Sequence, residues 1–148
     1  MPSEIRRLVF YHSEVTEALT NYGKDHGMDF PKGKVISAKL MNETEHDFHT
    51  QKFKKLEPTE GFDLSDEYNI RKMSVSILVV FFDEETFDHK YFSLSSEFIS
   101  SALIRYCINN AIPIPRRGKK KLDLTEFNVC LDIVIDSDNL ESLSLTLE

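Results

Sequence analysis

Two stretches of the chain carry apolar residues at the spacing of a helix. In each, apolar side chains recur at positions i, i+3, i+4 and i+7, which places them on one face of an amphipathic helix. The residues are Val15, Ala18, Leu19 and Tyr22 in the first stretch and Ile99, Ala102, Leu103 and Tyr106 in the second. We therefore expect two helices, each buried along one face. Phe98 and Ile108 widen the apolar face of the second helix, so we expect it to be the more buried one.

Both ends of each predicted helix are marked by suitable residues. Ser13 and Ser95 precede acids, and hydroxyl and carboxylate groups satisfy the free N–H groups at a helix start. Gly27 follows the first helix and suits the left-handed conformation that ends many helices. Asn109 and Asn110, followed by a proline, end the second helix.

The two helices belong to a longer internal repeat. Several residues of the first helical stretch return 84 positions later, and apolar residues match on both sides of them. The identical pairs are Ala18 and Ala102, Leu19 and Leu103, Tyr22 and Tyr106, and Pro31 and Pro115. We interpret the chain as two related halves, about residues 5–82 and 87–135.

Short apolar stretches that fit strands flank each predicted helix. Strands are expected at 5–11, 35–41 and 73–82 in the first half and at 87–94, 120–124 and 129–135 in the second. The sequence thus predicts one α+β domain over residues 1–136, built from pseudo-duplicated β-α-β-β units with two helices packed on a mostly antiparallel sheet. The pattern leaves the order of the strands open.

Two segments fall outside the repeating pattern. Residues 42–69 form a polar insertion in the first half, and loops of that length are commonly functional or disordered. Residues 137–148 form an acidic tail in which leucines are interleaved with polar residues. Such a tail is either frayed or a strand that can join a sheet edge. Exposed sheet edges and this tail also make a homodimer plausible.

Length and composition limit the class of protein. The chain has 148 residues, 41% of them hydrophobic, which suffices for a buried core and argues against intrinsic disorder. No apolar run reaches the ~20 residues of a membrane helix, and the N-terminus lacks the apolar stretch of a secretory signal. Cys107 and Cys130 form no C-x-x-C motif. We therefore expect a cytoplasmic protein with two reduced, buried thiols and no membrane contact.

Positive charge is concentrated in one short segment of an acidic chain. The formal net charge is −7, yet five basic residues lie within six positions after the second helix. They are Arg116, Arg117, Lys119, Lys120 and Lys121. Such a cluster fits the phosphates of RNA, DNA or a nucleotide, and Gly118 would let backbone N–H groups approach an anion. The alternative is a solvated turn whose charges suit the end of a helix.

A second candidate site lies in the insertion, where His46 and His49 stand among acids. Imidazole and carboxylate groups are ligands for Zn, Fe or Mn, which would allow a metal-dependent enzyme. The spacing matches no established metal motif, and solvated loop histidines are the alternative. Because the chain contains no recognised nucleophile, phosphate-loop or paired-carboxylate motif, we name no catalytic residue and no cofactor.

The end of the insertion mixes acids with apolar residues that could dock on a partner. Phe62, Leu64 and Tyr68 are the candidate contacts, and the alternative is that this segment folds back onto its own core. Our leading hypothesis is a non-enzymatic, cytoplasmic protein-interaction or adaptor module that binds a protein partner through its acidic loop and tail. Binding of nucleic acid or phosphate through residues 116–121 is the first alternative.

Overall fold

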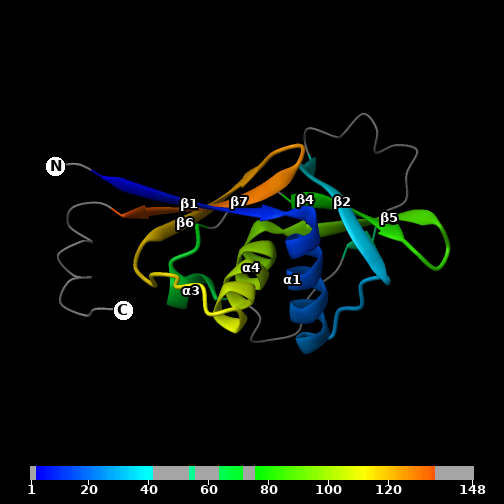
Figure 1. The fold of residues 1–148 in the computed structure, drawn as a ribbon, viewed down its shortest axis with the longest axis horizontal. Coiled ribbons are helices and arrows are strands. Elements are labelled where there is room, and N and C mark those ends of the chain that lie inside the picture. Colours follow the sequence, from blue (N-terminus) through cyan, green and yellow to red (C-terminus); the bar gives the residue numbers. More distant parts are fainter. Residues whose placement is uncertain (1–2, 42–53, 56–63, 72–75, 136–148) are drawn as a thin grey trace.

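The computed structural model describes residues 3–41, 54–55, 64–71 and 76–135 (Figure 1). Its elements are β1 (Glu4–Tyr11), α1 (His12–Asp25), β2 (Gly33–Leu40), β3 (Lys54–Lys55), α3 (Ser65–Tyr68), β4 (Ser76–Asp83), β5 (Asp88–Ser95), α4 (Ser96–Asn109), β6 (Lys119–Leu124) and β7 (Asn128–Ile135). Apart from the short elements β3 and α3, the order β-α-β-β occurs twice. The predicted α+β fold is therefore confirmed.

The strands form two sheets, where we had expected one. Their orders are β1-β7-β6 and β2-β4-β5-β3, and among the strands that the structure describes only the β3–β5 pair is parallel. The first strand of each half joins the sheet formed by the other half: β1 pairs with β7, and β5 pairs with β4. The two halves therefore hold each other together through hydrogen-bonded strands. The apolar pattern predicted the strands but carried no information about which strand pairs with which.

Helices α1 and α4 pack against each other and against the inner faces of the sheets (Figure 1). The core combines side chains from both helices and both sheets, and its largest fully buried apolar members include Leu19, Phe81, Phe98, Leu103 and Leu131. As expected, α4 is the more buried helix, with nine buried residues against five in α1. Ile108 differs from the expectation, since it is 42% exposed.

The helix ends follow the predicted signals with one exception. Gly27 has a φ of 72°, and α4 ends at Asn109, as expected. At the start of α4 the Ser95 hydroxyl accepts the Phe98 N–H at 3.1 Å. Helix α1 begins at His12, so Ser13 lies inside its first turn and is not the cap. There the Glu14 carboxylate accepts the N–H of Tyr11 at 2.9 Å, because β1 runs directly into the helix.

Among the described residues, none of the helices has the length and apolar character needed to cross a membrane.

Candidate functional site

The basic turn, residues 116–121, comprises the last part of the connection from α4 and the first three residues of β6, and it lies beside α3 (Figure 1). Successive side chains of a strand point to opposite faces, so the lysines at the start of β6 are not equivalent. Lys119 and Lys121 are exposed, whereas Lys120 is fully buried, with 0% of its surface accessible. Arg116 and Arg117 are exposed as well. Four of the five predicted anion-binding side chains therefore reach the surface.

The buried Lys120 side chain stabilises the turn through hydrogen bonds to its backbone. Its Nζ donates hydrogen bonds to the carbonyl oxygens of Arg116, at 2.9 Å, and Gly118, at 2.7 Å. The same Nζ lies 5.7 Å from the centre of the Tyr68 ring, within the range of a cation–π interaction. Burial lowers the pKa of the Lys120 ammonium to about 7, because the charged form is penalised away from water. This lysine fixes the backbone of the turn and does not itself face an external anion.

The segment from Leu64 to Arg71 also contacts Lys120. The guanidinium carbon of Arg116 lies 5.5 Å from the centre of the Tyr68 ring, so this ring faces two cations. A parallel bridge joins the segment to β6: the Lys120 N–H donates to the Asn69 carbonyl at 3.0 Å, and the Arg71 N–H donates to the Lys120 carbonyl at 2.8 Å. The turn is therefore clamped to its neighbour by main-chain and side-chain contacts.

Gly118 has a packing role that the sequence did not reveal. It is buried against β7, and a Cβ at this position would lie 2.5 Å from Cγ2 of Ile133. A side chain at this position would force the buried Ile133 side chain or the backbone beside it to shift. Close packing accounts for this glycine without the backbone–anion contact that we had predicted.

The predicted partner contacts of the insertion face inward where they are described. Tyr68 is 7% exposed beneath the basic turn, and Leu64 packs against the core while its N–H donates to the Ser101 hydroxyl at 3.2 Å. Phe62 lies outside the described residues. For Leu64 and Tyr68 the structure thus favours the alternative reading, in which this segment folds back onto its own core.

Neither predicted metal ligand, His46 nor His49, lies within the described residues, so both stay predictions. In the described part of the chain, no group of three or more His, Cys, Asp or Glu side chains is arranged to hold a metal ion. Cys107 and Cys130 are buried and free, as expected. Burial raises the pKa of the Cys107 thiol to about 11, which leaves it protonated and unreactive at neutral pH.

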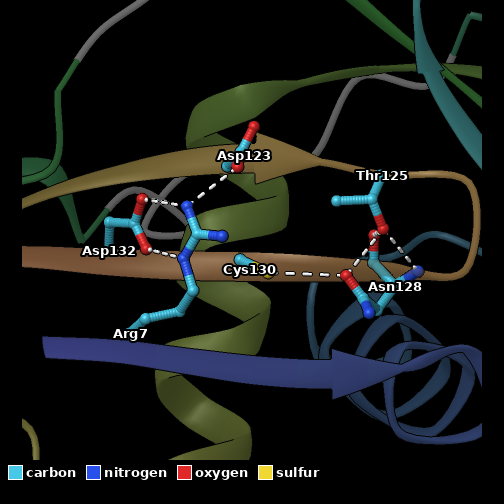
Figure 2. A network of polar contacts seen from close by, with 6 residues as sticks. All are labelled: Arg7, Asp123, Thr125, Asn128, Cys130 and Asp132. Atoms are coloured by element: carbon cyan, nitrogen blue, oxygen red, sulfur yellow. Dashed lines mark hydrogen bonds and ion pairs between the residues drawn. The ribbon is translucent and has the colours of Figure 1, made fainter.

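A polar network that the sequence analysis missed lies on the outer face of the sheet β1-β7-β6 (Figure 2). Arg7 on β1 contacts Asp132 on β7 through two hydrogen bonds of 2.7 and 2.9 Å, and Asp123 on β6 through one of 2.9 Å. The Arg7 guanidinium lowers the pKa of Asp132. The detectable signal was Asp132 itself, because a carboxylate in an apolar strand needs a cation nearby.

Comparison of the chain with protein-family models, with curated proteins and with solved structures finds no match in any of the three.

Proposed function

We propose that this chain is a non-enzymatic, cytoplasmic binding protein that contacts the phosphates of a nucleic acid through its basic turn. The observation that supports the proposal is the burial of Lys120. By binding two carbonyl oxygens of the turn, its ammonium holds the exposed cations Arg116, Arg117, Lys119 and Lys121 on a fixed backbone. A fixed set of cations loses less conformational entropy on binding than a flexible one.

The local charge balance also favours an anionic ligand. The carboxylate of Glu67 lies 3.5 Å from Arg116, and both side chains are more than half exposed, so the contact is weak and can exchange. Arg71 is exposed next to the turn and adds a fifth cation. This concentration of positive charge occurs in a chain whose net charge is −7. Long-range repulsion elsewhere on such a chain confines a polyanion to this patch.

The test is binding of fluorescently labelled single-stranded RNA, single-stranded DNA and duplex DNA, followed by anisotropy as salt is raised. Phosphate contacts release counterions, so four contacts to duplex DNA give a slope of log K against log salt of roughly −3 to −4. The informative variant is the triple change Arg117→Ala, Lys119→Ala and Lys121→Ala, which removes three exposed cations and leaves Lys120 in place. We expect it to weaken binding at least tenfold.

A matched control removes three exposed cations elsewhere on the chain, through Lys24→Ala, Lys34→Ala and Lys39→Ala. Both triple variants have the same net charge, so they separate a local site from general electrostatic attraction. The proposal predicts that the control keeps most of its affinity. Absence of binding at low salt, or equal losses in the two triple variants, would contradict it.

The hypothesis of a protein partner remains a separate prediction. Residues 42–53, 56–63 and 136–148 include most of the acidic loop and tail and lie outside the described residues. Partner recovery by chains that lack residues 42–63 or 136–148, compared with the full chain, tests it directly.

A further inference from the structure

The strands at the edges of the two sheets differ in how well they are protected. Exposed edges can pair with strands of other chains, and proteins usually cover or interrupt them. In the described part of the chain, β6 is bridged by Ile70, and β5 is paired with β3. Strand β2 has a shift in register between Val35 and Ser37 and carries exposed lysines. In the same part of the chain, strand β1 has neither a covering strand nor a shift in register, and its charged residues are Glu4, Arg6 and Arg7.

Strand β1 is a long, regular edge. All eight of its residues pair with β7 without a shift in register, and it contains neither proline nor glycine. Its outer face carries three exposed apolar side chains, Ile5 at 68%, Val9 at 41% and Tyr11 at 61% exposure. A long, regular edge with exposed apolar residues along one face is suited to pairing with another strand.

The single charge on this outer face is turned away from the free edge. Arg7 reaches across β7 to Asp132 and on to Asp123 of β6, as Figure 2 shows. Its guanidinium is therefore neutralised inside its own sheet. The charge that would otherwise protect the edge is withdrawn from it.

We propose that β1 pairs antiparallel with β1 of a second copy of this chain, around a two-fold axis at Leu8. Residues opposite each other in a sheet point to the same face, and the outer-face residues of β1 are the odd-numbered ones. The outer faces of the two copies therefore form one continuous face only when odd-numbered residues lie opposite odd-numbered residues. An axis at Arg6 or Arg7 would place two arginines directly opposite each other. An axis at Leu8 avoids both and pairs residues 5–11 of the two copies.

This register matches apolar side chains at both ends of the shared strand pair. Ile5 lies opposite Tyr11 of the second copy, and the symmetry repeats the contact at the other end. Aromatic and β-branched residues form favourable cross-strand pairs. A second copy thus supplies an apolar neighbour for two of the three exposed side chains of β1.

The test is the mass of the full chain in solution, measured by light scattering and sedimentation over a range of concentrations. We expect a dimer whose Kd rises about tenfold with Ile5→Lys or with Tyr11→Glu alone, because each removes two cross-strand apolar pairs. The double variant places each new ammonium opposite a new carboxylate of the other copy. It should recover most of the lost affinity, which only the Leu8-centred register predicts.

The control is Phe87→Lys, an equally drastic change at an 80% exposed residue between β4 and β5, and it should leave the dimer intact. A monomeric full chain at every soluble concentration overturns the proposal, as does a double variant no better than either single one. A chain that dimerises only after removal of residues 136–148 also overturns it, and would assign the edge to the tail.

Discussion

The two halves of the molecule are alike on the inside of the sheets and differ on the outside. Helices α1 and α4 have the same length, and the bonds that follow them correspond. The Met28 N–H donates to the Gly23 carbonyl, and the Ile112 N–H donates to the Cys107 carbonyl, both at 2.8 Å. The chain thus forms the same backbone hydrogen bond after each helix, where the helix end packs on a sheet.

On the outer faces, equivalent positions carry different chemistry. The register that pairs Arg7 with Asp132 in one sheet pairs Tyr91 with Val80 in the other. Inner positions are constrained by the shared core, whereas outer positions can change without loss of packing. Properties specific to one half should therefore depend on residues that have no chemical counterpart in the other half.

Lys120 is an exception to this division, because it lies on the inner face. Its equivalent in the first half is Val35: Val35 pairs with Phe81 and Lys120 pairs with Ile133, at corresponding positions of the two sheets. Val35 is 2% exposed and Lys120 is 0% exposed. One half buries an aliphatic side chain where the other buries an amine.

The largest expected effect comes from replacing this amine with an apolar side chain of similar length, Lys120→Met. The native pKa of Lys120 lies below its unfolded value of 10.5, so the unfolded chain binds the proton more tightly. The free energy of unfolding should therefore rise as pH increases from about 7 towards 10.5, with no further change from this group below pH 7. Lys120→Met removes this contribution.

The measurement is urea unfolding of the parent and the variant at several pH values. The parent should gain about 3 kcal/mol relative to Lys120→Met between pH 7 and about 9.5. Val35→Met is the control at the equivalent position and should parallel the parent over this range. A constant difference between the parent and Lys120→Met would show that the amine is not buried as described.

The residues that follow the two helices offer a reciprocal exchange. Gly27 and Ala111 occupy equivalent positions, with φ values of 72° and 57°, in the left-handed region that costs a residue with a Cβ about 1–2 kcal/mol. We expect Gly27→Ala to lower the free energy of unfolding by about 1–2 kcal/mol and Ala111→Gly to raise it by about 0.5–1 kcal/mol. Thermal and urea unfolding would measure both changes. Changes of the same sign at the two positions would show that the helix ends are not equivalent.

The helix starts differ between the halves and give a third, smaller effect. Ser95 caps α4 with its side chain, so Ser95→Ala should cost about 1 kcal/mol. Ser13 lies inside the first turn of α1 and is exposed, so Ser13→Ala should change stability by less than about 0.5 kcal/mol. Unfolding in urea distinguishes the two. If Ser13→Ala is the costlier change, Ser13 is the cap, as its position in the sequence had suggested.

The elements could be predicted from the sequence, but their partners could not. The spacing of apolar residues located both helices and the main strands to within a few residues. This works because the side chains that face the core recur with the period of the helix or strand that carries them. Strand pairing depends on which apolar faces meet after folding, and β1 and β5 have similar apolar character. The exchange of strands between the halves therefore left no local signal.

The same limit applied to the basic turn. The five cations were visible as a charged segment, and alternation along a strand implied that either Lys120 or both Lys119 and Lys121 would point inward. The choice between these two outcomes depended on the register of β6 against β7. The carbonyl oxygens that accept hydrogen bonds from the buried amine belong to the turn itself. Tyr68 was identified as a notable residue, but its contact with Arg116 and Lys120 joins segments far apart in the sequence.

The smallest expected effect concerns the outer-face contact that one half has and the other lacks. Asp132 is 5% exposed, and its carboxylate accepts a hydrogen bond from Arg7. The Arg7 guanidinium lowers the pKa of this carboxylate. The contact should therefore stabilise the fold at neutral pH, and this stabilisation should be lost as pH falls through the lowered pKa. Because the Arg7 side chain is 47% exposed, Asp132→Asn should lower the free energy of unfolding by only about 0.5–1 kcal/mol at pH 7, and the stabilities of parent and variant should converge in acid.

Asp88→Asn is the control. The 4.0 Å contact between Asp88 and Lys90 joins two exposed side chains, so its removal should have no measurable effect on stability. Urea unfolding at pH 7 and at about pH 3 tests both, and an equal cost for the two substitutions would show that Arg7 gains nothing from lying across the sheet.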